Sequence, residues 1–420
     1  MYRKTVLDSG IRITSERVPH CRTVAVGIWV DVGSRDEHDL NNGCCHFIEH
    51  MLFKGTGKRS PQQIAIEFDM LGGASNAFTS RENTCYYATV LDNHLEALVD
   101  LLADMFLNSL FDREELLRER QVILQEISMV EDQPDDLIHD LFFAQLWGRH
   151  PLGKPVLGTR EVVASMDPKK LLDHVNTYYL PGNVLISAAG SVDHDRFVEL
   201  WERRLRGIRR DGGTGNGLVR RPPVELDQPV RRVYAKPLEQ VHAVLGTYGL
   251  PQNDEDRFVL LLLNVLLGGN MSSRLFQEIR ENRGLAYSIY SYVDSFVDSG
   301  MLGIYLGVDA ETLNESLEVV AEQVGRLAEE AVPEQELANA REFARGGLYI
   351  SAENMESRMT RNARNEFCFD RYFSYEETAA ALDRVTAEDV HLLAKRLFLR
   401  PLTAAVVGPM EPHEVRWGGL

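Results

Sequence analysis

The stretch Arg210–Pro223, RDGGTGNGLVRRPP, decides how the chain is organised. Four of the six residues from Gly212 to Gly217 are glycine, which excludes a stable helix or a central strand there. The stretch lies almost at the midpoint of 420 residues, a length that leaves room for two or three domains. It therefore predicts a linker at residues 210–223 between an N-terminal domain, residues 1–209, and a C-terminal domain, residues 224–420. A long surface loop within one domain is the alternative.

The two halves share one order of expected elements, with strands marked by alternation and helices by apolar residues every three or four positions. In the first half these are a strand at Thr23–Val32, a helix at Gly43–Phe53, a strand near Tyr86, helices at Leu95–Phe106 and Arg113–Val130, and a strand from Val184. Their counterparts are Val230–Tyr248, Arg257–Leu267, a strand near Tyr287, Leu313–Leu327, Glu334–Leu348 and a strand from Leu402. Runs of strands followed by helices favour an α+β fold, here duplicated within the chain.

Composition and charge exclude several classes of protein. The chain is 44% hydrophobic and 26% charged, as in ordinary globular proteins, and its net charge is −18. That charge disfavours partners such as nucleic acid or an anionic membrane. The longest apolar stretch, Phe258–Leu267, is interrupted by Asn264 and is too short to span a bilayer. Five cysteines and the absence of a targeting segment at the N-terminus predict a cytoplasmic protein.

The sharpest chemical signal is His46-Phe47-Ile48-Glu49-His50, an H-x-x-E-H pattern. On a helix, positions i and i+4 bring both imidazoles to one face, where they can share a metal ion. Glu49 lies three residues from His46 and can stand beside the metal without binding it. Asn41 or Asn42 is the expected N-cap of this helix. The alternative is a pair of surface histidines.

A zinc ion that keeps an open position needs a third protein ligand. The expected helix Arg113–Val130 carries Glu119 and Glu126, which lie two turns apart and therefore share a face. Either could reach the metal while the other supports the ligands. A charged solvent face is the alternative, although apolar neighbours around Glu126 weaken it. A structural zinc site would need four Cys or His ligands, and no cysteine is spaced to complete one.

Three strings resemble the pitrilysin-type (inverzincin) metallopeptidases. They are GCCHFIEHMLFKGT from Gly43, LGGASNAFTSRENTCYYATVL from Leu71, and GNMSSRLFQEIRENRGLAYSIYSY from Gly269. Glu126 follows His50 by 76 residues in a V-I-L-x-E context, as in that family. The resemblance covers nearly the whole chain and is greatest to short members, which include mitochondrial processing peptidase subunits and their bacterial relatives.

The resemblance implies a fold and an active site. The fold is a pair of related α+β domains, each with a mostly antiparallel sheet flanked by helices, and two such chains close around a chamber as a homodimer. His46, His50 and Glu126 would bind one Zn²⁺ per chain. Glu49 would be the general base, and Glu119 would help to hold the metal histidines.

The resemblance also assigns substrate contacts. Arg280 and Tyr287 would donate hydrogen bonds to the oxyanion, although a surface arginine and a packed strand tyrosine are the alternatives. An extended peptide would pair as an added strand with Asn76, Ala77, Phe78 and Thr79. An ordinary strand covered by its neighbours is the alternative there.

The resulting prediction is a zinc-dependent endopeptidase that hydrolyses unfolded peptides or short protein segments inside a chamber. The rival hypothesis is a non-catalytic partner subunit, but such chains in this family lose the metal residues that are intact here. Three residues depart from the usual pattern of the family: Cys44 and Cys45, where small residues are usual, and Gln125 in place of a frequent Glu. Cys45 is about 100° around the helix from His46, so we expect it to be buried and not a metal ligand.

Overall fold

The computed structural model describes residues 1–206, 218, 220–226 and 228–419. They form two compact units, each with one sheet flanked by helices. The first unit contains Met1–Met129, Lys154–Arg220 and Ser351–Tyr372, and the second contains Val130–Gly153, Arg221–Ile350 and Phe373–Leu420. Most of the predicted linker, residues 210–217 and 219, lies outside the described residues. No helix in the described part of the chain is long and apolar enough to span a membrane.

The sheet of the first unit has the strand order β1-β2-β6-β3-β5-β4. Its strands are β1 (Tyr2–Val6), β2 (Arg12–Arg17), β3 (Thr23–Val30), β4 (Ala74–Thr79), β5 (Thr84–Leu91) and β6 (Val184–Gly190). Only the β2–β6 pairing is parallel. Every residue of β3 after Thr23 is buried, because helices cover both faces of the sheet at this strand. Its nearly continuous apolar sequence therefore follows from its central position.

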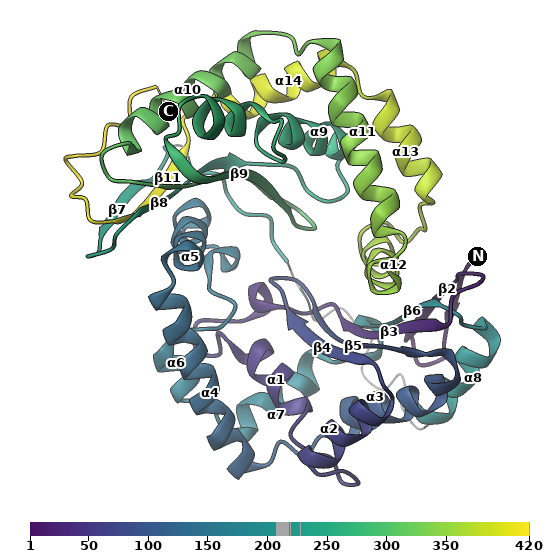
Figure 1. Ribbon diagram of the computed structural model, residues 1–420. Coiled ribbons are helices and arrows are strands. Elements are labelled where there is room, and N and C mark those ends of the chain that lie inside the picture. Colours follow the sequence, from purple (N-terminus) through teal and green to yellow (C-terminus); the bar gives the residue numbers. More distant parts are fainter. Residues whose placement is uncertain (207–217, 219, 227, 420) are drawn as a thin grey trace. The chain divides into compact units, whose positions relative to one another are not determined.

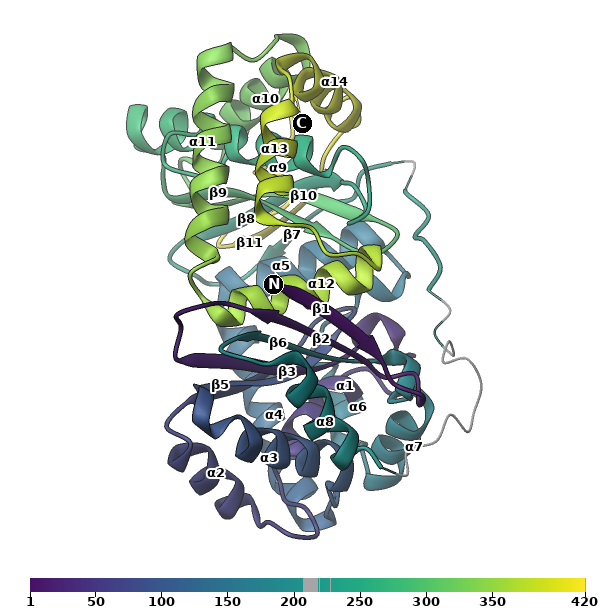
Figure 2. The ribbon, with the colours of Figure 1, turned by 90° about the vertical axis from the view of Figure 1, so that its right-hand side faces the viewer.

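Most helices of the first unit lie on one face of the sheet, and α12 lies on the other (Figure 1). The helices are α1 (Cys44–Leu52), α2 (Pro61–Met70), α3 (Leu95–Asn108), α4 (Arg113–Asp132), α6 (Arg160–Ala164), α7 (Pro168–Tyr178), α8 (His194–Arg204) and α12 (Met355–Phe369). Helix α4 continues three residues past the boundary of the unit. Helix α12 crosses β2, β3 and β6, as Figure 2 shows from a second direction.

The second unit repeats the arrangement with a five-stranded sheet of order β7-β11-β8-β10-β9, in which only β7–β11 is parallel. Its strands are β7 (Arg231–Ala235), β8 (Val241–Tyr248), β9 (Ala286–Ser295), β10 (Gly300–Val308) and β11 (Thr403–Gly408). Its helices are α5 (Pro134–Trp147), α9 (Arg257–Leu267), α10 (Leu313–Glu329), α11 (Glu334–Ser351), α13 (Tyr375–Arg384) and α14 (Ala387–Phe398). The predicted α+β class, with mostly antiparallel sheets flanked by helices, is confirmed.

Two helices pack on the sheet that belongs to the other half of the sequence. Helix α5 comes from the first half, yet its Phe142 packs with Val244 of the second sheet. Helix α12 comes from the second half, yet its Met359 packs with Trp29 of the first. Each packing unit is therefore built from segments of both halves of the sequence. The division into domains at residues 1–209 and 224–420 describes the two sequence repeats and stays a prediction.

Met359 joins α12 to the first sheet, which yields a test of that packing. Its side chain is fully buried, and its Sδ accepts a hydrogen bond from Trp29 Nε1 at 3.2 Å. Met359→Ala should destabilise the first unit by roughly 2–5 kcal/mol, because it leaves a cavity and removes an acceptor. Urea unfolding followed by tryptophan fluorescence measures the effect.

Met70→Ala is the matched control, because Met70 lies in the same unit and is 74% exposed. That change should alter the free energy of unfolding by less than about 0.5 kcal/mol. Equal effects of the two changes would contradict the packing described for α12.

Candidate metal centre

Helix α1 places the H-x-x-E-H residues by burying its other face. Its apolar residues, which recur every three or four positions, are buried beneath the helix: Cys44, Cys45, Phe47, Ile48, Met51 and Leu52. His46, Glu49 and His50 remain partly exposed on the opposite side. The hydrophobic period of the helix thus determines the direction in which the three polar side chains point.

The expected N-cap of α1 is wrong. The N-cap is Gly43 in a left-handed conformation (φ 91°), and no side chain at that position caps the helix. Instead the buried carboxylate of Glu37 accepts hydrogen bonds from the backbone N–H of Gly43 and of Cys45, each at 2.7 Å. Asn42 also donates to Glu37, at 3.0 Å. A buried carboxyl group from outside the helix therefore takes the place of a short local cap.

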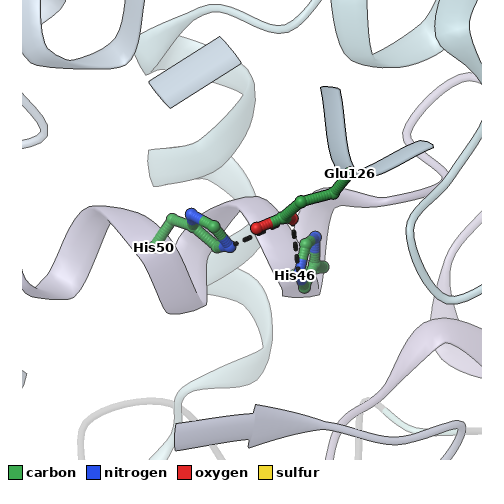
Figure 3. A group of neighbouring side chains, drawn as sticks. All are labelled: His46, His50 and Glu126. Atoms are coloured by element: carbon green, nitrogen blue, oxygen red, sulfur yellow. Dashed lines mark ion pairs between the residues drawn. The ribbon is translucent and has the colours of Figure 1, made fainter. Parts of the chain in front are cut away.

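His46, His50 and Glu126 form a group that could hold one metal ion (Figure 3). Glu126 Oε2 lies 3.7 Å from His46 Nε2 and 3.6 Å from His50 Nε2. These separations are too long for hydrogen bonds, and Glu126 Oε2 is a buried atom without a hydrogen-bond partner among the described residues. Bonds of about 2 Å to a tetrahedral zinc ion would separate the ligand atoms by about 3.3 Å. The donor set therefore fits zinc and leaves a fourth position open.

The two histidines have opposite pKa shifts. Burial, with the neighbouring His50, lowers the pKa of His46 to about 3. Burial acts in the same direction on His50, but its contact with Glu119 and the charges of Glu126 and Glu49 outweigh burial and raise its pKa. His46 is thus neutral, the form in which imidazole binds a metal.

Glu119 occupies the second position considered on α4 and contacts the far side of His50. Its Oε2 lies 3.1 Å from His50 Nδ1, and its Oε1 pairs with Lys54 Nζ at 2.7 Å. Burial raises the pKa of Glu119, but the contacts with His50 and Lys54 outweigh burial and lower the pKa below its usual value. The structure therefore brings Glu126 to the Nε2 atoms of both histidines and Glu119 to the opposite ring nitrogen of His50.

Glu49 lies between the metal group and strand β4. Its carboxylate is largely buried, which raises its pKa. Thr79, the last residue of β4, donates a hydrogen bond from Oγ1 to Glu49 Oε2 at 2.6 Å. The sequence placed Thr79 in the expected substrate strand but gave no sign of this contact.

The expected substrate residues Asn76, Ala77, Phe78 and Thr79 all lie on β4. They pair with β5 on one side only, from Asn76 opposite Tyr87 to Thr79 opposite Thr84. Strand β4 ends the sheet order, so its other edge carries no strand among the described residues. Such an edge offers backbone groups to an extended peptide.

Arg280 and Tyr287 lie together in the second unit. Arg280 belongs to a π-helical segment, Phe276–Asn282, and Tyr287 follows on β9. The Arg280 guanidinium lies 4.9 Å from the ring centroid of Phe276 and 5.4 Å from that of Tyr287. Tyr287 is 79% exposed, so it is not the packed strand residue considered as the alternative.

Sequence reasoning missed two buried residues beside the metal helix. Glu37 lies in a run of charged residues that resembles an exposed loop. Burial raises its pKa to about 7, although the hydrogen bonds from its N–H donors lower the pKa. His174 on α7 lies 3.3 Å, Nε2 to Sγ, from Cys45. Cys45 is buried as expected.

Comparisons with known proteins bear on the family of the chain. A family model described as insulinase (peptidase family M16) matches residues 12–160, and one described as the peptidase M16 inactive domain matches residues 165–343. The chain is 42% identical to a Bacillus subtilis protein named "Uncharacterized zinc protease YmxG", over 97% of this chain and 98% of that one. It is 38% identical to "Uncharacterized zinc protease SCO5738" of Streptomyces coelicolor, over 98% and 90%.

Among solved structures, a Helicobacter pylori protein described as a protease superposes with a TM-score of 0.92 at 20% identity. The match covers 97% of this chain and 99% of that one. At this identity the likeness bears on the fold alone, and it supports the two-sheet arrangement described above.

The metal group leads to a binding prediction. The purified chain should bind about one zinc ion, and His50→Ala should abolish tight binding because two donors remain. Glu119→Gln should weaken the zinc affinity by about 10–100-fold, because it weakens the contact that orients His50 but removes no ligand. Competition with a fluorescent chelator measures each affinity.

Glu114→Gln is the matched control, since Glu114 lies on the same helix and its side chain is 82% exposed. Its zinc affinity should equal that of the unchanged chain. A loss at Glu114 as large as that at Glu119 would show that general charge, and not the contact with His50, controls binding.

Proposed function

The chain belongs to the M16 (insulinase) family of peptidases, which confirms the resemblance read from its motifs, and from that premise we propose that it is a zinc-dependent endopeptidase. The observation that carries the proposal is the group of His46, His50 and Glu126, whose possible ligand atoms all lie within 4.8 Å of one another. The substrates we propose are unfolded peptides and short protein segments.

His46, His50 and Glu126 would hold the metal, and the chemistry proceeds from the residues beside it. Zinc held there would supply Lewis acidity, which polarises a peptide carbonyl and lowers the pKa of water toward neutrality. His46 is kept neutral by burial. Glu119, paired with Lys54, would orient His50 through its Nδ1.

Glu49 would act as the general base. Its carboxylate is largely buried and has a raised pKa, which makes it a stronger proton acceptor than an exposed glutamate. It would take a proton from the attacking water and deliver it to the amine of the departing product. Arg280 and Tyr287 would donate hydrogen bonds to the oxygen that gains negative charge.

The unpaired edge of β4 would hold the substrate as an added strand along Asn76–Thr79. Backbone pairing requires an extended chain and depends little on side chains. Peptides without stable structure meet that requirement, whereas a folded domain would have to open first. This is the support for unfolded substrates.

The proposed assembly is a homodimer around a chamber, and the proposed location is the cytoplasm. The assembly rests on the resemblance of the motifs to those of two-domain members of the family. The location rests on the cysteines, all five of which are free, as expected in a reducing compartment. A non-catalytic partner subunit is the competing function, and the intact metal group argues against it.

Glu49→Gln should separate metal binding from chemistry. Glutamine keeps the shape and an acceptor oxygen but cannot take a proton, so turnover should fall by at least ~10²-fold while zinc is retained. Cleavage of a quenched fluorescent peptide, with zinc content measured on the same sample, tests the prediction. Near wild-type turnover would remove Glu49 as the base, and inactivity of the unchanged zinc-loaded chain would favour the partner-subunit hypothesis.

The proposed dimer predicts complementation between two inactive variants. If Arg280 and Tyr287 act on the zinc centre of the other subunit, Glu49→Gln and the double variant Arg280→Ala/Tyr287→Phe should each be nearly inactive alone. After subunit exchange about half of the dimers are hybrids with one intact site, so roughly a quarter of wild-type activity should return. Mixing each variant with the unchanged chain controls for exchange. No recovery despite exchange would mean that each chain completes its own site.

A further inference from the structure

Strand β4 connects the edge of the first sheet to the metal helix. Ala77 packs against the core cluster beneath α1, whereas Phe78 packs on the opposite face of the sheet, beside Trp29. Side chains alternate along a strand, so Thr79 shares the face of Ala77. On that face its hydroxyl meets the carboxylate of Glu49.

This contact is the one hydrogen bond that the described residues give to Glu49. It joins Thr79 Oγ1 to Glu49 Oε2 at 2.6 Å, a short distance typical of a hydroxyl that donates to a carboxylate. Thr79 is β-branched, and its backbone is fixed by pairing with Thr84, so the hydroxyl is held rigidly. Glu49 rotates about three side-chain bonds and would otherwise be poorly fixed.

A base works only when the oxygen that takes the proton is within hydrogen-bond reach of it. Fixing Oε2 to Thr79 leaves Oε1 as the oxygen that can meet the attacking water. Thr79 also lies at the end of the strand edge along which the peptide would pair. One residue thus relates the position of the base to the position of the bound backbone.

We propose that Thr79 is a positioning residue for peptide hydrolysis: its hydroxyl holds Glu49 Oε2 so that Oε1 faces the water. This inference rests on the proposed function, in which Glu49 is the base. Thr79 itself exchanges no proton and touches no metal ligand. Its contribution should therefore appear in turnover and not in the binding of zinc or of peptide.

Thr79→Val and Thr79→Ser test the inference. Valine keeps the branched shape and the strand pairing but lacks the hydroxyl, so kcat and kcat/KM should both fall by about 10–100-fold with KM unchanged. Serine keeps the hydroxyl and should restore kcat to within a few-fold of the unchanged chain. Zinc affinity, measured by chelator competition, should be the same in all three proteins.

Peptide binding can be measured without turnover in the Glu49→Gln variant. There Thr79→Val should leave the dissociation constant of a labelled peptide, measured by fluorescence anisotropy, unchanged within about twofold. The double variant should also lose no further activity beyond Glu49→Gln, because the hydroxyl acts only through the base.

Thr89→Val is the matched control. Thr89 lies on β5 of the same sheet, and its hydroxyl is buried with no hydrogen-bond partner among the described residues, so kcat should be unchanged. Wild-type kcat in Thr79→Val, while Glu49→Gln is inactive, would overturn the inference and leave the proposed function standing. Full activity of Glu49→Gln would overturn the function instead.

Thr79→Ala tests whether an effect of Thr79→Val comes from loss of the hydroxyl or from the shape of valine. If alanine and valine both lower zinc affinity or weaken peptide binding, Thr79 holds the strand or the helix and the positioning role is wrong. If alanine lowers kcat as valine does with zinc and peptide binding intact, the inference is supported by two variants of different shape.

Discussion

The hydrogen bonds between Glu37 and the start of helix α1 are the interaction on which the candidate metal centre depends. The first N–H groups of a helix have no partner within it and carry partial positive charge. Glu37, 3% exposed, accepts from two of them. Burying a carboxylate is unfavourable unless such donors are present. Glu37 therefore stays buried only where the helix begins, and its hydrogen bonds in turn hold the start of the helix in place.

The other end of α1 is tied to α4. Lys54, just beyond the helix, pairs with Glu119, which also contacts His50. Between the two ends, Phe47 and Ile48 of α1 share a core cluster with Ile123 and Ile127 of α4. Glu126 lies next to Ile127 in sequence. The distance from Glu126 to the histidines therefore follows from apolar packing between α1 and α4 and from the contacts of Glu119 with Lys54 and His50.

Local patterns in the sequence were sufficient for the elements that build this centre. The i, i+4 spacing of His46 and His50 requires a helix, and α1 is that helix. The two-turn spacing of Glu119 and Glu126 predicted a shared face, and both carboxylates lie near His50. The spacing alone left open which of the two would approach the Nε2 atoms of the histidines, because a seven-residue spacing treats them alike, whereas the resemblance to the family assigned Glu126. In the structure the packing of α4 brings Glu126 to these atoms.

Contacts between distant segments had no comparable signal. Glu37 stands in a charged run where hydropathy predicts exposure, and its burial depends on the backbone of a helix that starts seven residues later. The bond from Thr79 to Glu49 joins a strand to a helix, so it depends on how α1 lies on the sheet. Periodicity determines which face of an element is buried, but not which neighbour covers it.

The placement of α12 shows how that ambiguity is resolved. Its apolar face alone could cover either sheet, since both have buried apolar faces. Its charges distinguish them: Glu366, fully buried, pairs with Lys4 and Arg12, and on the adjacent turns of the helix Arg358 and Asn362 contact Glu16.

These partners all belong to β1 and β2 of the first sheet. A buried charge left without its partner is strongly destabilising, so α12 on any other surface, or in a shifted register, would lose far more than it gained from apolar contact. The ion pairs thus select the location of the helix, and the apolar contact of Met359 with Trp29 stabilises it once there.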